Sequence, residues 1–107
     1  MSNTVFDLNG TTLTVKPFGE LDSLSAPIFE EEFRRHLSDA TDIIVDFKEV
    51  GYISSAGIRV FLAVENTLEK QGANMKLIHV NKHIIEIFEL VGFMDLVTVE
   101  KSNGSDA

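Results

Sequence analysis

Apolar side chains recur at about every second position in residues 11–18, which is the spacing of a half-buried strand. Residues 5–8 form a short strand candidate, and residues 11–18 alternate with a period of two and are rich in β-branched side chains. The Asn9-Gly10 pair between them is a strong hairpin-turn signal. This part of the chain therefore predicts two antiparallel strands joined by a tight turn.

Three later segments are also expected to be strands. Residues 42–47 are almost continuously apolar, which is the pattern of a strand covered on both faces in a parallel sheet. Residues 75–80 and 96–99 are further apolar runs that contain β-branched members. The segments that separate these strands have a different period and are expected to be helical.

Between the strands the apolar positions recur every three to four residues, which predicts three amphipathic helices. The first helix follows a loop at residues 19–23 and has Pro27 in its first turn, where proline is tolerated. The second ends at Gly72 and the third at Gly92, since glycine suits the left-handed position after a helix. The apolar stripes comprise Ala26, Phe29, Phe33 and Leu37 in the first helix, Ile58, Phe61, Leu62 and Leu68 in the second, and Ile84, Ile87, Phe88 and Val91 in the third.

The resulting order of elements is β-β-α-β-α-β-α-β. Strands that alternate with helices are joined by right-handed crossovers and form a largely parallel sheet. The sequence therefore predicts an α/β fold with a mostly parallel central sheet and an antiparallel N-terminal strand. A chain of 107 residues is long enough for one domain and too short for two. We expect a single domain over residues 1–107, with a core at about 4–100 and a polar tail at 101–107.

Composition and charge narrow the range of partners. The formal net charge of −8 disfavours a nucleic-acid partner, because an acidic surface repels phosphates. The chain has no cysteine, which removes disulfides and thiolate metal sites. No apolar stretch is long enough to span a bilayer and no signal peptide is evident, so we expect no membrane insertion and a cytoplasmic location.

Two neighbouring serines, Ser54 and Ser55, stand where a predicted strand feeds the second helix. The start of a helix has unpaired N–H groups and a partial positive charge, so it favours an anion. One interpretation is that a serine caps the helix, which accounts for one hydroxyl but not for two. The other is that a serine here carries a phosphate. The small residues Ala56 and Gly57 would let another protein surface approach the backbone closely.

The common catalytic and metal-binding motifs do not match this chain. A nucleophile elbow requires a glycine two residues before the serine, and neither Ser54 nor Ser55 has one. The phosphate-binding motif G-x-x-x-x-G-K-[ST] and the metal motif H-E-x-x-H are also absent. A hydrolase that uses Ser55 is the enzymatic alternative. Our expectation is a protein with no catalytic activity, cofactor or metal.

A second candidate site is the loop before the first helix, which contains Asp22 and Ser23. An aspartate in such a loop is commonly a turn or cap residue. This loop and the serine motif both follow predicted strands, and the loops at the carboxyl ends of parallel strands form the usual binding edge of an α/β sheet. We therefore expect the two loops to share one edge, which is the best candidate for a functional surface.

The same two segments resemble the STAS domain family, specifically the anti-sigma factor antagonists. The sequence GELD at residues 19–22, followed by Ala26, resembles the family segment G-E-L-D-x-x-x-A. The sequence YISSAGI at residues 52–58 resembles the family phosphorylation motif, usually D-S-[SAT]-G-[LI] after an apolar pair. The sequence LVGF at residues 90–93 and the order of elements also fit. The resemblance covers about residues 4–100 and implies a STAS-type fold.

The resemblance implies a role for each position of the serine motif. The family phosphoacceptor falls on Ser55, with Ser54 as the second choice, and the family aspartate falls on Ser54, which is a departure from the pattern. Arg59 replaces the second glycine of the frequent G-L-G ending and adds a positive charge within one turn of Ser55. The residues expected to contact a partner are Asp22, Ser23, Ser54, Ala56, Gly57, Ile58 and Arg59.

The resemblance also implies partners and a mode of action. In this family an anti-sigma factor that is also a serine kinase of the GHKL type phosphorylates the serine, and a PP2C-type phosphatase removes the phosphate. The unphosphorylated antagonist binds the anti-sigma factor and so releases the sigma factor. We therefore expect a phosphorylation-controlled binding module that is a monomer or weak dimer. The alternative within the family is a scaffold subunit of a larger assembly, such as a stressosome or a lipid-transport complex.

Overall fold

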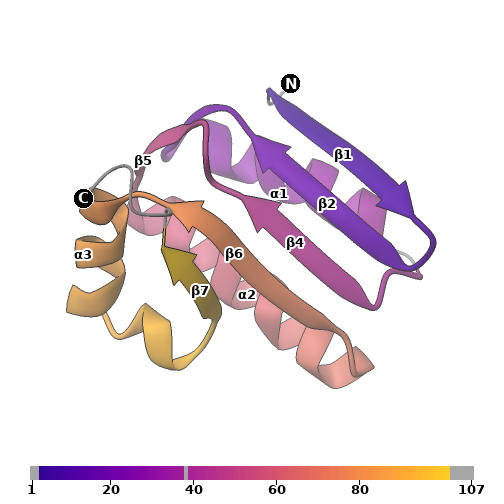
Figure 1. Cartoon of the computed structure of the whole chain (residues 1–107). Helices are drawn as coiled ribbons and strands as arrows, with labels where there is room; N and C mark the ends of the chain where they lie inside the picture. Colours follow the sequence, from indigo (N-terminus) through magenta and orange to yellow (C-terminus); the bar gives the residue numbers. More distant parts are fainter. Residues whose placement is uncertain (1–2, 38, 102–107) are drawn as a thin grey trace.

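The central sheet has five strands. The structure, a computed structural model, describes residues 3–37 and 39–101. The strands of this sheet are β1 (Thr4–Asn9), β2 (Thr12–Pro17), β4 (Asp42–Asp46), β6 (Asn74–Val80) and β7 (Thr98–Lys101). They lie in the order β1-β2-β4-β6-β7, with β1 antiparallel to β2 and all other neighbours parallel (Figure 1). The predicted α/β fold with a mostly parallel sheet and an antiparallel N-terminal strand is confirmed.

Two short strands that the sequence pattern did not predict form a second sheet. β3 (Gly19–Leu21) lies in the segment expected to be a loop, and β5 (Val50–Ile53) directly precedes the two serines. The two strands pair in parallel. Strands of three and four residues are too short to show a clear period of two, so the pattern of the sequence did not reveal them.

The helices are α1 (Ser25–Leu37), α2 (Ser55–Gln71) and α3 (Lys82–Leu90), followed by the short 3-10 helix η1 (Phe93–Asp95). Each α-helix lies in a segment where apolar spacing predicted it. No helix in the described part of the chain is long and apolar enough to cross a membrane. Apart from β3, β5 and η1, the order of elements agrees with the predicted order.

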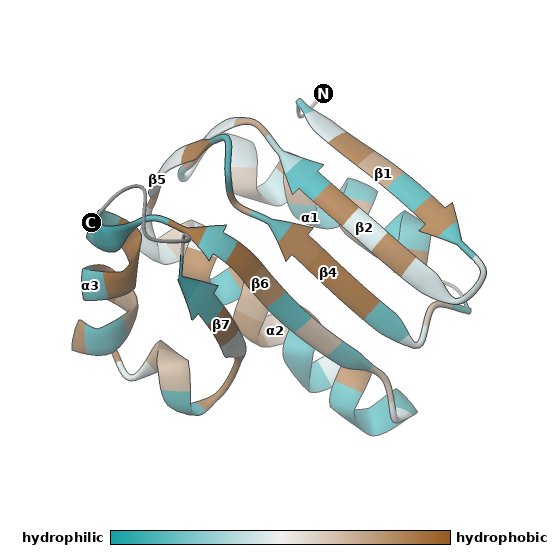
Figure 2. Cartoon of the chain, viewed as in Figure 1, coloured by the Kyte–Doolittle hydropathy of each residue, from teal (hydrophilic) through white to brown (hydrophobic). Residues whose placement is uncertain are grey.

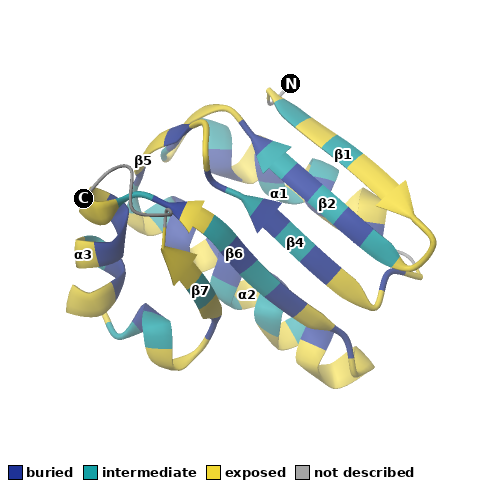
Figure 3. Ribbon diagram, in the orientation of Figure 1, coloured by how far each residue is buried: buried dark blue, intermediate teal, exposed yellow. Residues whose placement is uncertain are grey.

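Helices α1 and α2 lie on the same face of the central sheet (Figure 1). β4 is hydrophobic along almost its whole length in Figure 2, but only alternate residues are buried in Figure 3. Ile43 and Val45 are buried beneath the helices, whereas Ile44 between them is partly exposed on the other face. The expectation that residues 42–47 form a strand covered on both faces is therefore wrong. An isoleucine on the open face made the apolar run look continuous in the sequence.

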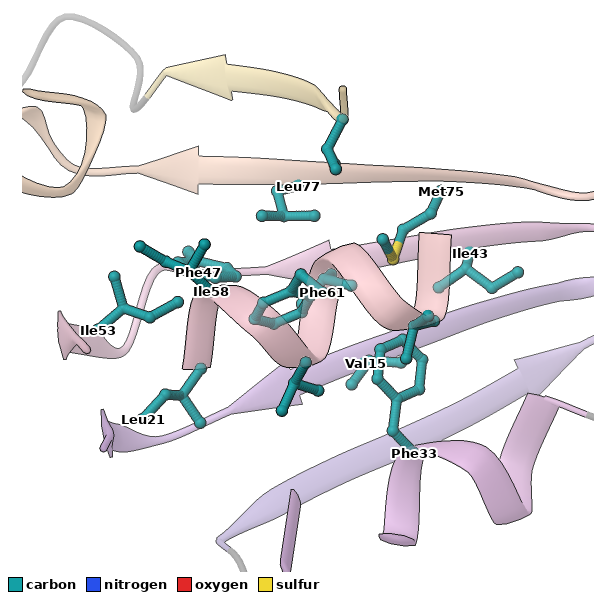
Figure 4. Close-up of a cluster of buried hydrophobic side chains, with 14 of the residues drawn as sticks. Val15, Leu21, Phe33, Ile43, Phe47, Ile53, Ile58, Phe61, Met75 and Leu77 are labelled. Carbon is teal, nitrogen blue, oxygen red and sulfur yellow. The ribbon is translucent and has the colours of Figure 1, made fainter. Parts of the chain in front are cut away.

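Phenylalanine rings fill much of the core between the helices and the sheet. The six phenylalanines that are almost fully buried are Phe29, Phe33, Phe47, Phe61, Phe88 and Phe93. The ring centroid of Phe61 lies 5.6 Å from that of Phe29 and 5.4 Å from that of Phe47. Figure 4 shows Phe61 on α2 among buried side chains that come from the strands and from α1. These ring contacts hold α2, the helix that follows the two serines, against both α1 and the sheet.

The predicted apolar stripes are buried or partly buried with one exception. Leu62 and Ile87 are partly buried against the core, and Val91 is 56% exposed. Val91 escapes burial because α3 ends at Leu90 and the chain then turns at Gly92, whose φ is 75°. At the end of the chain, Lys101 is the last residue of β7 rather than the start of a polar tail. Residues 102–107 of that expected tail lie outside the described residues.

Candidate functional site

The two candidate loops lie side by side because β3 and β5 pair with each other. Leu21 is opposite Ile53 in this pair, and the Ser54 N–H donates a hydrogen bond of 2.9 Å to the carbonyl oxygen of Leu21. The chain therefore enters the loop at Asp22 and the helix at Ser54 from neighbouring strands. The expectation that the two loops share one edge is confirmed.

Ser54 is the N-cap of α2. Its backbone is extended (φ −96°, ψ 176°), and its hydroxyl oxygen accepts a hydrogen bond of 3.5 Å from the Gly57 N–H. Its carbonyl oxygen accepts the first bond of the helix, from the Ile58 N–H at 3.0 Å. The capping interpretation therefore holds for this serine. Serine and aspartate are comparable N-caps, so serine in the family aspartate position keeps the cap and omits the charge.

Ser55 is the first residue of α2 and is exposed. Its hydroxyl makes no hydrogen bond to any residue in the described part of the chain. The two serines are thus different: the fold uses the hydroxyl of Ser54 and leaves the hydroxyl of Ser55 accessible. A phosphate on Ser55 would lie next to the unpaired N–H groups of the first helical turn, which favour an anion.

Replacing Ser54 with alanine is expected to lower the free energy of unfolding by about 0.5–1 kcal/mol, the lower part of the range for N-cap removal. The reason is the 3.5 Å length of the capping hydrogen bond, which makes it a weak one. Urea unfolding followed by circular dichroism measures this difference. The control is Ser54→Asp, which supplies another capping oxygen and is expected to be at least as stable as the wild type. An alanine variant as stable as the wild type would show that the hydroxyl does not cap α2 in solution.

Asp22 caps the start of α1. Its Oδ1 accepts hydrogen bonds of 3.0 Å from the N–H groups of Leu24 and Ser25. In return, the Ser25 hydroxyl accepts a bond from the Asp22 N–H and donates one of 2.7 Å to the carbonyl oxygen of Glu20. The hydrogen bonds from the N–H groups of Ser25 and Leu24 hold the pKa of the Asp22 carboxyl below its ordinary value. Asp22 therefore shapes the loop, and a contact with a partner stays a prediction for this residue and for the exposed Ser23.

Two residues expected at the partner surface face the inside of the protein instead. Gly57 is buried, and a Cβ atom added to it would lie 2.7 Å from Cγ1 of Ile53 and 2.8 Å from the carbonyl oxygen of Leu21. The side chain of Ile58 is 8% exposed and belongs to the core. The small residue at position 57 thus allows α2 to pack closely on β3 and β5, which is a contact within the chain. We therefore place no partner contact on the side chain of Ile58.

The remaining residues of the motif lie on the outside of α2. Ala56 is partly buried, and Arg59 is exposed. Arg59 makes no ion pair or hydrogen bond to the residues that the structure describes. Both residues line a groove between α1 and α2. The motif therefore presents a free hydroxyl, a small side chain and a free cation in the first two turns of the helix.

Sequence reasoning missed two apolar side chains at this edge. Leu24, two residues after Asp22, is 82% exposed, and Tyr52 on β5 is 41% exposed. Large apolar side chains that are exposed supply contact area for a protein partner. The sequence did contain a signal for one of them, because Leu24 is an apolar residue between two serines in a polar loop. An apolar residue in such a loop is a candidate for contact with another protein.

The three histidines make no hydrogen bond to Ser55 in the described part of the chain. His79 lies with Nδ1 2.9 Å from Oδ1 of Asp46, and the ring of His36 stacks on Phe6 with centroids 3.9 Å apart. Neither these two residues nor His83 is hydrogen-bonded to a serine of the motif. Within the described ranges, no group of three or more histidine, aspartate or glutamate side chains is placed to hold a metal ion. The site offers an accessible hydroxyl and several exposed side chains.

Comparisons with known proteins agree with this geometry. A family model described as STAS domain matches residues 4–105. The anti-sigma-B factor antagonist of Bacillus subtilis (strain 168) is 30% identical to this chain over 97 residues, which cover 90% of this chain and 89% of the relative. The anti-sigma-B factor antagonist of Staphylococcus aureus (strain NCTC 8325 / PS 47) is 32% identical over 88 residues, which cover 81% and 82%.

Among solved structures, the Bacillus cell fate determinant SpoIIAA in its phosphorylated form has a similar fold. It superimposes with a TM-score of 0.70 at 18% identity, covering 90% of this chain and 89% of SpoIIAA. This likeness shows that the two proteins share a fold.

Proposed function

The chain belongs to the STAS domain family, and from this premise we propose that it is an anti-sigma factor antagonist. The Bacillus subtilis relative bears that name, and the two chains match over almost their whole lengths. Antagonists of this kind are regulatory binding proteins, so we assign this chain to that class and not to the enzymes. The observation that carries the proposal is the exposed hydroxyl of Ser55, which is free of hydrogen bonds to the described residues at the start of α2.

We place the regulatory phosphorylation on Ser55, with Ser54 as the second choice. Phosphorylation adds about 1.5–2 negative charges. The first turn of α2 stabilises an anion at this position, so the fold should tolerate the phosphate. A partner docked on the same edge would have to remove water from that charge, which is unfavourable unless the charge is paired. The unmodified chain is therefore the form that binds, and the phosphorylated chain is the form that is released.

The proposed docking surface consists of exposed side chains from both loops. Ser23 and Leu24 come from the loop before α1, Tyr52 comes from β5, and Ser55 and Arg59 come from α2. Half-buried Ala56 lies among them, while Gly57 and Ile58 hold α2 in place from below. Apolar, small and charged side chains thus meet within one edge, which is the composition of a transient protein interface.

The partner proposed for this surface is an anti-sigma factor with serine kinase activity of the GHKL type. Binding of the unmodified antagonist to that factor would free the sigma factor, and a PP2C-type phosphatase would reset the switch. The support is the family resemblance at residues 19–26 and 52–58 together with the accessible serine.

Incubation with the cognate anti-sigma factor and ATP is expected to add one phosphate to the chain, and peptide mapping should locate it on Ser55. Intact-mass spectrometry measures the number of phosphates. The matched controls are Ser55→Ala, which should take up none, and Ser54→Ala, which should still take up one because Ser54 is a capping residue.

Two outcomes of this experiment would contradict the proposal. A phosphate located on Ser54 would exchange the roles of the two serines. Absence of any phosphate, together with stable co-purification of the chain in a large assembly, would instead favour the scaffold role within the same family.

A further inference from the structure

A groove lies between α1 and α2, and its lining includes Ala56, the residue that follows Ser55. Its volume is about 390 Å³, and its walls are mostly small or apolar, with Ala26 from α1 and Ala56, Val60 and Ala63 from α2. The two helices lie beside each other on the same face of the sheet (Figure 1). Because the lining side chains are short, the backbone of a partner can lie close to both helices and place its side chains in the groove.

The charges that line this groove are not balanced. Glu30 lies on the α1 side and is already paired, since its Oε2 is 2.9 Å from Nε of Arg34. Arg34 also donates a hydrogen bond of 3.1 Å to the Thr67 hydroxyl, which ties the two helices together. Arg59 on the α2 side has no ion pair or hydrogen bond to any residue in the described ranges. The guanidinium of Arg59 is therefore the uncompensated charge of the groove.

We infer that this groove receives a segment of the anti-sigma factor that presents a carboxylate to Arg59, an inference that rests on the proposed function. A guanidinium favours a carboxylate because two parallel N–H···O bonds form between them. The small apolar walls favour aliphatic side chains on either side of that carboxylate. The partner segment is thus acidic at its centre and apolar at its flanks.

Arg59 also connects this groove to the phosphorylation site. Ser55 and Arg59 are four residues apart on one helix and both are exposed, so their side chains share a face at about 5–6 Å between Cβ atoms. A phosphate on Ser55 comes within reach of the guanidinium and pairs with it. The partner carboxylate then loses its cation and meets a dianion instead. Phosphorylation therefore weakens partner binding in two ways: it adds negative charge to the interface, and it engages Arg59 in a different ion pair.

The test measures the dissociation constant for the cognate anti-sigma factor by calorimetry. The variants are Arg59→Gln and the control Arg35→Gln, which removes the same charge from an exposed i,i+4 pair on α1. We expect Arg59→Gln to weaken binding about ten-fold and Arg35→Gln to leave it within about two-fold. The ratio of the dissociation constant of the phosphorylated protein to that of the unmodified protein should also fall about ten-fold in Arg59→Gln. This variant already lacks the ion pair with the partner carboxylate, so phosphorylation cannot remove it.

The outcomes separate this inference from the proposed function. If the wild type binds the anti-sigma factor and both variants bind equally well, the groove assignment is wrong and the proposed function stands. If the wild type does not bind the anti-sigma factor at all, both fail together. If Arg59→Gln changes only the self-association of the chain in sedimentation experiments, the groove receives a second copy and the assignment to the anti-sigma factor is wrong. Thermal unfolding confirms that both variants are folded.

Discussion

Replacing Ser55 with aspartate is expected to leave the chain folded and to weaken its binding to the anti-sigma factor by two to three orders of magnitude. Ser55 is exposed and its hydroxyl bonds to no described residue, so the fold loses no contact. A carboxylate in the first turn of α2 is electrostatically favourable within the chain. In the complex this carboxylate and the carboxylate of the partner compete for Arg59, so one of the two is desolvated without a cation, which costs about 3–4 kcal/mol, or about 100- to 1,000-fold in affinity. Calorimetry measures the affinity, and circular dichroism verifies the fold.

Two neutral variants separate charge from size at this position. Ser55→Asn has almost the shape of aspartate without its charge and is expected to bind within about ten-fold of the wild type. Ser55→Ala should bind as the wild type does and should no longer respond to ATP. If aspartate and asparagine weaken binding equally, steric exclusion and not charge operates the switch. An aspartate variant that binds as tightly as the wild type would exclude Ser55 from the interface.

The sequence was informative wherever a long element or a motif carried the signal. The 3.6-residue spacing located all three α-helices, and the Asn9-Gly10 pair located the hairpin, in which Leu8 is opposite Leu13. The shared edge of the two loops followed from their positions after strands. The assignment of capping to Ser54 did not follow, because two adjacent hydroxyls look alike in a sequence. Only the direction of each side chain shows which one reaches the Gly57 N–H.

What the sequence could not show depends on neighbours that are distant along the chain. β3 and β5 are strands because they pair with each other. Neither is long enough to show an alternating apolar pattern in the sequence. Ile44 looked like a core residue because composition does not say how many faces of a sheet are covered. Gly57 looked like an opening for a partner, but the atoms that approach it belong to Leu21 and Ile53. In each case a tertiary contact overrides the local pattern.

Replacing Gly57 with alanine is expected to lower the free energy of unfolding by about 1–3 kcal/mol, the usual cost of overpacking a tight site. The added Cβ would lie 2.7 Å from Cγ1 of Ile53 and 2.8 Å from the carbonyl oxygen of Leu21. The second contact is with backbone, so no change of rotamer relieves it. Alanine also gains about 1 kcal/mol of helix propensity over glycine, which offsets only part of this cost. Urea unfolding measures the difference.

The control is Gly51→Ala, on the strand that leads to the same helix. A Cβ added at Gly51 meets no atom within 4 Å, so this variant is expected to be as stable as the wild type or slightly more stable. Gly57→Ala should also weaken binding of the anti-sigma factor, because moving α2 away from β3 strains the bond from Ser54 to Leu21 that sets the position of Ser55. Equal stabilities of the two alanine variants would mean that α2 does not pack on β3 and β5 as closely as described. A stability loss without a loss of binding would mean that the edge keeps its shape when α2 shifts.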